Sequence, residues 1–267
     1  MPAIPLDYSL NLPPGFTVFT DPTDSFNEPF HGFGFGFNPG NPPITNHGAT
    51  LGRVLFYDPL LSLNNSTSCA SCHHQELAFS DGRASSKGFA GATTPRNSMA
   101  IINAGFNNNL FWDARESNVK GLVTRPIQNH IEIGVEEMRR LECKLAKVDY
   151  YPALFQAAFG DSQVTEDRIA SALAQFVCAI TTTNSRFDQA MSTNLELFTP
   201  LEKSGMALFF SERTNCSRCH AGPNFAAPDF VGGEYGSSFD AIHSNGNFGE
   251  NLKGGANNGL DTRYSDG

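Results

Sequence analysis

The sequence has 267 residues, of which 40% are hydrophobic and 11% aromatic, enough to bury the core of one large domain or two small ones. A formal charge of -9 at pH 7 and an isoelectric point near 5.2 argue against nucleic acid as a partner, because phosphates attract basic surfaces. No run of about 18 apolar residues is present, so no membrane-spanning helix is expected, and MPAIPLDYSLNLPP lacks the features of a secretory signal peptide.

The first 45 residues are rich in Pro, Gly and Phe, and HGFGFGFNPGNPP favours a loop wrapped on a surface. A strand with alternating Phe is the alternative, although glycine at every second position weakens it. A helix is expected next in GATLGRVLFYD, because apolar residues recur at helical spacing at Leu51, Val54, Leu55 and Phe56. Pro59 ends that run.

A polar loop is expected from Asp81 to Asn97, and three helical stretches follow later in the chain. In GVEEMRRLECKLAKV, apolar residues recur at Val135, Met138, Leu141 and Leu145, with acids early and bases late, as the helix dipole favours. VTEDRIASALAQFVCAI offers Thr165 as an N-cap. FTPLEKSGMALFF has a capping box of Thr199 and Glu202 around Pro200. The chain after Ala221 is rich in Gly, Asn and Asp and shows little periodicity.

Two C-x-x-C-H motifs carry the chemistry, and each follows a predicted helix. The first consists of Cys69, Cys72 and His73, and the second of Cys216, Cys219 and His220. Covalent haem attachment needs two thiols spaced to reach two vinyl groups, and a histidine directly after them to bind the iron. A four-cysteine zinc site normally has its pairs about 15 to 20 residues apart, much closer than here. A thioredoxin-like pair would need a preceding strand and would leave both histidines unexplained. The sequence therefore predicts two haem c groups.

The remaining thiols and His74 are expected to have ordinary roles. His74 cannot face the iron together with His73, so a surface position or one beside a haem propionate is expected. Cys143 and Cys178 lie in helical stretches, where a free cysteine is usually small, apolar and buried. The repeated order of helix and motif predicts two related domains, residues 1–195 and 196–267.

Five segments in order resemble the bacterial dihaem cytochrome c peroxidase and MauG family. They are LGRVLFYDPLLSLNNSTSCASCHHQELAFSDGRASSKGFAG, PRNSMAIINAGF, FWDAR, RPIQNHIEIG and NCSRCHAGPNF, within about residues 50–225. The resemblance implies a periplasmic, all-α protein with long loops, two cytochrome-c-like domains with one haem each, and a calcium ion between the domains. It also implies that the N-terminal haem reacts with hydrogen peroxide. The C-terminal haem would take electrons from a small protein such as a monohaem cytochrome c or a cupredoxin.

The resemblance also implies roles for individual residues. His73 and His220 would be the proximal ligands of the two haem irons. Trp112 would lie between the haems and relay electrons, with a core position as the alternative. Glu132 would be the distal acid, taking a proton from one peroxide oxygen and returning it to the other, or else a solvated helix-start residue. Asn97 would bind calcium through its amide oxygen, or else satisfy a turn.

Several positions depart from the family pattern. Phe89 in SKGF stands where members that need reductive activation carry a removable histidine ligand, and Phe cannot bind iron. The N-terminal haem is therefore expected to be open to peroxide without prior reduction, as in MauG-like members, with His130 as the alternative ligand. Leu122 stands where many members have a distal Gln, which removes a hydrogen bond. Ala114 replaces a common Gly in WDGR and is expected to be tolerated.

The distal ligand of the second haem belongs, in the family, to a later segment that this chain lacks. Tyr235, His243 and Tyr264 are the substitutes that the sequence offers. The resemblance thus implies a C-terminally incomplete family member.

The expected function is reduction of hydrogen peroxide to water with electrons from a small redox protein. A MauG-like oxidase of a protein or organic substrate is the first alternative, and a non-catalytic dihaem electron carrier is the second. A homodimer is one assembly compatible with the sequence.

Overall fold

The computed structural model describes residues 5–10, 38–107, 109–193, 195–218, 220 and 225, without the side chains of Met191, Ser192 and Arg218. Most of the expected N-terminal loop lies outside these residues, as do Cys219, Tyr235, His243 and Tyr264. In the described residues the regular structure is helical, and the only β contacts are isolated bridges. None of the described helices is long and apolar enough to cross a bilayer.

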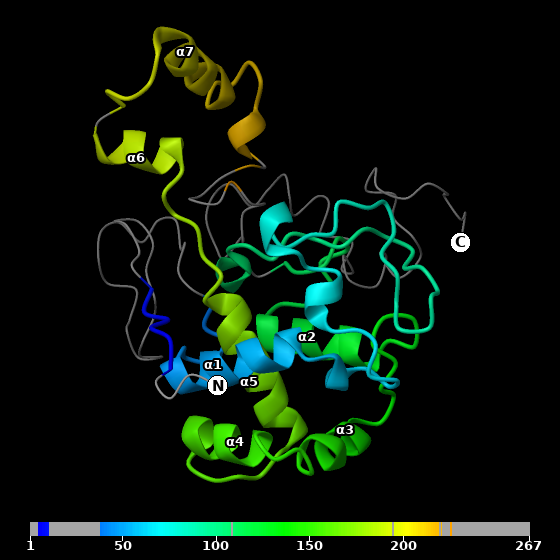
Figure 1. Cartoon of the computed structure of the whole chain (residues 1–267). Coiled ribbons are helices and arrows are strands. Elements are labelled where there is room, and N and C mark those ends of the chain that lie inside the picture. The colour runs from blue at the N-terminus through cyan, green and yellow to red at the C-terminus, as the bar shows by residue number, and fades with distance from the viewer. Residues whose placement is uncertain are drawn as a thin grey trace.

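The α-helices are α1 (Asn46–Tyr57), α2 (Val119–Gln128), α3 (Met138–Leu145), α4 (Tyr151–Phe159), α5 (Glu166–Cys178), α6 (Arg186–Ser192) and α7 (Pro200–Phe209). Short 3-10 turns cover Pro59–Leu61, Cys69–Ser71, Gln75–Leu77, Ala104–Phe106 and Cys216–Arg218. Helices α1 to α5 form one bundle, while α6 and α7 lie beyond one end of it (Figure 1). No residue of α7 is buried.

The contact between α1 and α5 is the centre of the bundle. Ten consecutive residues of α5, Ile169 to Cys178, are buried. A Cβ added to Gly52 of α1 would lie 1.9 Å from the carbonyl oxygen of Ala172 in α5, so only glycine allows the two backbones to approach this closely. The start of α1 also docks on α5, because the Gln175 side chain accepts a hydrogen bond from the Thr45 backbone N–H at 2.8 Å.

The predicted caps are confirmed. The Thr165 side chain caps α5 by accepting from the Arg168 N–H, and Thr199 and Glu202 form the reciprocal capping box of α7. Helix α3 begins only at Met138, so the expectation that Val135 belongs to it is wrong.

The prediction for the two separate cysteines is half correct. Cys178 is fully buried in α5. Cys143 lies in α3 but is exposed. The buried side of α3 is formed by Met138, Leu141 and Leu145, and Cys143, two positions from Leu141, falls on a different side of the helix.

Three loops of the same length cover one side of the bundle. An antiparallel bridge closes each loop, pairing His74 with Ser80, Lys87 with Thr93, and Leu110 with Glu116. The first loop follows His73, the second carries Phe89 and the third carries Trp112. Of the candidate functional residues, Phe89 and Trp112 therefore lie in loops that are closed by their own bridges.

Candidate haem-binding site

The first C-x-x-C-H motif forms one tight turn. The backbone N–H groups of Cys72 and His73 both donate to the Cys69 carbonyl at 3.1 Å, so the three side chains come from a single turn. Both thiols are half-buried and neither is in a disulfide. Burial raises the pKa of Cys69 to about 12 and also raises the pKa of Cys72. Two protonated thiols on one turn are the groups that form thioether bonds to a haem.

The ring of His73 is held in one tautomer. Its Nδ1 lies 2.6 Å from the Phe79 carbonyl oxygen and 3.2 Å from Ser98 Oγ. A carbonyl can only accept, so Nδ1 carries the hydrogen and Nε2 keeps its lone pair for a metal. Burial is the main cause that lowers the pKa of His73, which favours the neutral ligand form. A histidine that binds a metal through one ring nitrogen usually donates its other ring N–H to a carbonyl or carboxylate, as Nδ1 does here.

The loop after His73 aims the Phe79 carbonyl. Ala78 and Phe79 have φ angles of 56° and 59°, so the chain turns back through the left-handed region and brings that carbonyl under the imidazole. Aromatic rings from the bundle pack nearby. The Phe56 ring of α1 lies 6.2 Å from the His73 ring and 5.2 Å from Phe176 of α5. These residues fit a covalently bound haem.

Glu132 is connected to this motif through residues 87–89, because the Phe89 N–H donates to the Glu132 carbonyl at 3.0 Å and Cys72 Sγ lies 3.8 Å from the Lys87 carbonyl oxygen. Burial is the main cause that raises the pKa of Cys69 and Cys72, and the Glu132 carboxylate adds to it. Burial raises the pKa of Glu132, and the nearby Arg115 guanidinium offsets part of that rise. Glu132 is thus a half-buried carboxyl group without the environment of a solvated surface residue.

Phe89 packs directly against the Glu132 segment. The Phe89 backbone N–H donates to the Glu132 carbonyl at 3.0 Å. A Cβ on Gly134, which has φ of 81°, would lie 2.3 Å from Cε1 of the Phe89 ring, so the ring rests in a place that only glycine leaves open. On the other side of the same loop, Cys72 Sγ lies 3.8 Å from the Lys87 carbonyl oxygen. The loop with Phe89 therefore connects Glu132 to the attachment turn.

Trp112 is half-buried and is not part of the buried core, which argues against the simple core interpretation. Its indole Nε1 donates to the Asn97 carbonyl at 3.1 Å. The loop that carries Trp112 turns through Phe111 and Ala114, with φ of 65° and 53°. Alanine in that conformation costs about 1 kcal/mol that a glycine would not.

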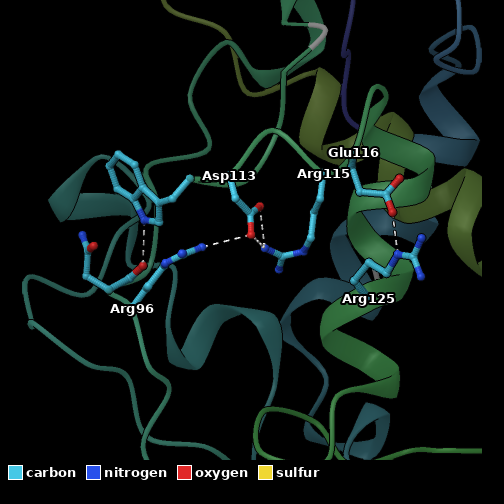
Figure 2. Close-up of polar contacts among 7 residues, drawn as sticks. Arg96, Asp113, Arg115, Glu116 and Arg125 are labelled. Carbon is cyan, nitrogen blue, oxygen red and sulfur yellow. Dashed lines mark hydrogen bonds and ion pairs between the residues drawn. The ribbon is translucent and has the colours of Figure 1, made fainter. Parts of the chain in front are cut away.

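Ion pairs of Asp113 and Glu116 follow Trp112 in the same loop (Figure 2). Asp113 lies between two arginines, with Oδ2 3.0 Å from Arg96 Nη1 and Oδ1 2.7 Å from Arg115 Nη1. Arg115 also stacks over the Phe111 ring at 3.6 Å from its centroid. A separate ion pair joins Glu116, at the bridge that closes the loop, to Arg125 of α2 at 2.5 Å.

Asn97 lies at the predicted calcium position, and its backbone carbonyl receives the Trp112 indole. Its side-chain nitrogen contacts the Ser98 carbonyl at 3.5 Å. No group of three or more His, Cys, Asp or Glu residues in the described part of the chain could hold a metal ion. Calcium binding at Asn97 therefore stays a prediction.

The second motif repeats the geometry of the first where the structure describes it. The His220 N–H donates to the Cys216 carbonyl at 2.9 Å, and His220 Nδ1 lies 3.1 Å from the Phe225 carbonyl oxygen. Phe225 has φ of 49°, much as Phe79 does in the first motif. His220 is exposed, whereas His73 is half-buried.

The remaining candidate residues are His130, Leu122 and His74. His130 is exposed, and Leu122 packs against the edge of the core. His74 is half-buried, with its backbone paired to Ser80. No role was predicted for Ser98, Asp113 or Arg115, although all three lie inside the motifs PRNS and FWDAR.

Comparison with known proteins agrees with this geometry. The profile of the di-haem cytochrome c peroxidase family matches residues 46–196. The cytochrome c551 peroxidase of Nitrosomonas europaea is 33% identical over 175 residues, covering 66% of this chain and 52% of that protein. The methylamine utilization protein MauG of Methylophilus methylotrophus is 29% identical over 189 residues, covering 70% of this chain and 56% of that protein.

A solved structure shows the same fold. It is a MauG-like protein associated with microbial copper homeostasis, 31% identical, with a TM-score of 0.63 over 71% of this chain and 57% of that one. The chain spans about half the length of the curated relatives it matches. The chain belongs to the di-haem cytochrome c peroxidase family, which confirms the resemblance and the all-α fold.

Proposed function

We propose that this chain carries the peroxide site of a dihaem c-type peroxidase, which reduces hydrogen peroxide to two waters using two electrons and two protons. The observation that supports it best is a half-buried carboxyl group with a raised pKa, Glu132, beside a C-x-x-C-H turn. Haem attached at Cys69 and Cys72 supplies the iron that binds peroxide and takes up its oxidising equivalents. The protein supplies the axial ligand, the proton transfer and the path for electrons.

Glu132 would move the proton. Its carboxylate takes a proton from the oxygen of peroxide nearer the metal and returns it to the outer oxygen, so that water is the leaving group. A carboxyl group of ordinary pKa would be a weak base for this step, and burial of Glu132 strengthens it.

Phe89 supports the further proposal that no reductive activation is needed. Its side chain has no atom that binds iron, and its ring is held on Gly134 beside Glu132. In the proposed site the Phe89 ring would supply an apolar group beside Glu132, and Leu122 would supply no hydrogen bond, so Glu132 would be the main polar group there.

The second half of the proposal concerns electrons. Two cytochrome-c-like domains, residues 1–195 and 196–267, would each hold one haem c, the second through Cys216, Cys219 and His220. Electrons from a small donor such as a monohaem cytochrome c or a cupredoxin would enter at His220 and pass by Trp112. A calcium ion at Asn97, a periplasmic location and a homodimer complete the proposal.

The test is a spectroscopic one. Absorption and EPR spectra of the fully oxidised, haem-loaded protein are recorded before and after hydrogen peroxide, without reductant. The proposal expects a high-spin signal that peroxide converts. Purely low-spin spectra that do not respond to peroxide would mean that His130 or another group binds the iron, and an electron carrier or a reductively activated peroxidase would then replace the proposal.

A MauG-like oxidase of a protein or organic substrate is the second candidate, and Phe89 is the observation that favours it. Turnover of peroxide with a reduced monohaem cytochrome c separates the two. Sustained oxidation of the cytochrome supports the peroxidase, whereas a peroxide response without cytochrome oxidation supports the oxidase.

A further inference from the structure

Residues 96–98 contact three different parts of the site, one from each residue. Arg96 pairs with the Asp113 carboxylate at 3.0 Å, and the Asn97 carbonyl accepts from the Trp112 indole at 3.1 Å. The Ser98 hydroxyl donates to the Cys72 carbonyl at 2.7 Å and lies 3.2 Å from His73 Nδ1. One short segment therefore joins the loop of Trp112 to the turn that holds the iron ligand.

Two neighbouring side chains of the Trp112 loop reach this segment. Trp112 reaches it by one hydrogen bond and Asp113 by a charged one, and they attach to adjacent residues, Asn97 and Arg96. The Leu110–Glu116 bridge closes this loop, and the two further attachments at Trp112 and Asp113 fix the orientation of the part that lies between the bridge residues.

Asp113 is well suited to be the fixed point. Its side chain is only 16% exposed, and Arg115 Nη1 donates to both of its oxygens, to Oδ1 at 2.7 Å and to Oδ2 at 2.8 Å (Figure 2). Burial acts to raise the pKa of Asp113, but Arg115 and Arg96 together lower it below its ordinary value. The carboxylate therefore stays charged at working pH.

We propose that Asp113 is a positioning residue, which through Arg96 holds the Trp112 indole on the Asn97 carbonyl and so fixes Trp112 relative to His73. The proposal deepens the proposed function and rests on it only where it predicts a rate, since Trp112 is there the electron relay. The position of the Trp112 indole on the Asn97 carbonyl does not depend on whether Trp112 relays electrons.

The test compares Asp113→Asn with Glu116→Gln in the haem-loaded protein. Glu116 is the matched control, because it is a carboxylate of the same loop, 12% exposed and paired with an arginine, but its partner Arg125 lies on α2 away from residues 96–98. Trp112 is the only tryptophan in the chain, so ultraviolet resonance Raman spectra of the indole N–H report on this one hydrogen bond.

Asp113→Asn is expected to shift the indole band toward a weaker hydrogen bond and to slow single-turnover oxidation of the reduced second haem by peroxide by about 10- to 100-fold. Arg96→Gln is expected to give the same band shift, and it decides the question if Asp113→Asn does not fold. Glu116→Gln is expected to leave the band in place. An unchanged band in Asp113→Asn, or an equal shift in Glu116→Gln, would overturn the proposal.

Trp112→Phe distinguishes failure of the positioning proposal from failure of the electron-relay role proposed for Trp112. If Asp113→Asn shifts the band while Trp112→Phe and Asp113→Asn both keep the parent rate, Asp113 positions Trp112 but Trp112 does not relay electrons. The positioning proposal then stands and the relay assigned to Trp112 fails.

Discussion

Burial and a neighbouring cation act on Glu132 in opposite directions. Removal from water disfavours the charged carboxylate and raises its pKa, while Arg115 favours the charge and offsets part of the rise. A base with a pKa nearer to neutrality takes a proton more readily from a weak acid such as peroxide. The balance between the two effects should therefore set the acid limit of activity.

The first prediction concerns this balance. The role proposed for Glu132 requires its carboxylate form, so the rate is expected to fall as pH falls through a pKa above the ordinary 4.5. Arg115→Gln removes the lowering influence and is expected to move this acid limb to higher pH. Glu132→Gln is expected to lose the limb and to slow the reaction by about 10²- to 10⁴-fold.

Stopped-flow rates of the peroxide reaction between pH 4 and 8, about the range that brackets the limb, provide the measurement. Arg125→Gln is the control, since Arg125 pairs with Glu116, whereas burial and Arg115 are what shift the pKa of Glu132. A profile that is the same in the parent protein and in Glu132→Gln would contradict the role of Glu132.

The second prediction concerns Phe89. Phe89→His places a nitrogen ligand at the position where reductively activated relatives are expected to have one. We expect the oxidised N-terminal haem to change from high-spin to low-spin in EPR spectra, and the peroxide response to require prior reduction. Phe89→Leu, which keeps an apolar side chain and cannot bind iron, should remain high-spin and serves as the control.

At the scale of the elements, the backbone contact between α1 and α5 supports the haem site. Phe56 of α1 lies between Phe176 of α5 and the His73 ring. The contact at Gly52 and Ala172 sets the separation of the two helices, and so also the position of Phe56 behind the imidazole.

The third prediction tests this contact with two identical substitutions. Gly52→Ala is expected to lower the free energy of unfolding by about 1 to 3 kcal/mol or more, because the new Cβ meets the backbone of α5. Gly205→Ala in α7, with no atom within 4 Å of its new Cβ, is expected to raise it by about 0.5 to 1 kcal/mol. Urea unfolding followed by circular dichroism measures both, and equal effects would contradict the close approach.

The same elements show what the sequence could predict. Helices α1, α5 and α7 have clear apolar periodicity or caps, and all three were predicted. Helix α2 was missed because Pro126 lies inside it, and α4 was missed because YPALFQAAF is apolar on most sides and so has little periodicity. Helix α6 has a capping box of Ser185 and Asp188 that could have revealed it, but it has only seven residues.

The site was partly predictable for a related reason. Residues that bind a haem follow a fixed spacing, so Cys69, Cys72 and His73 could be found directly. The Arg96–Asp113 pair joins residues 17 positions apart, and Ser98 reaches His73 across 25 positions. Such contacts depend on how the loops fold back on one another, which local sequence does not specify.

At the scale of the whole molecule, the two motifs should act as separable units, because each histidine has its own carbonyl partner, Phe79 for His73 and Phe225 for His220. The fourth prediction is that the chain carries two covalent haems. Replacing both Cys69 and Cys72 by Ser should remove one haem and the peroxide response. Replacing both Cys216 and Cys219 should also remove one haem, but should leave the spectral response to peroxide.

Mass spectrometry of the intact protein counts the haems, and absorption spectra with peroxide report the response. A chain with one haem in the parent protein, or a peroxide response that survives loss of Cys69 and Cys72, would contradict this assignment of the two sites.

The three bridge-closed loops have a consequence for how such a protein diversifies. Because an antiparallel bridge closes each loop, a residue inside one loop can be exchanged without opening the bridges of the other two. If Phe89, Phe79 and Trp112 have the roles proposed for them, the activation requirement, the support of the proximal ligand and the electron relay would be traits that can be inherited separately. Exchange of residues 87–93 alone for the matching loop of a reductively activated relative should transfer the activation requirement and leave the loops of His73 and Trp112 unaltered.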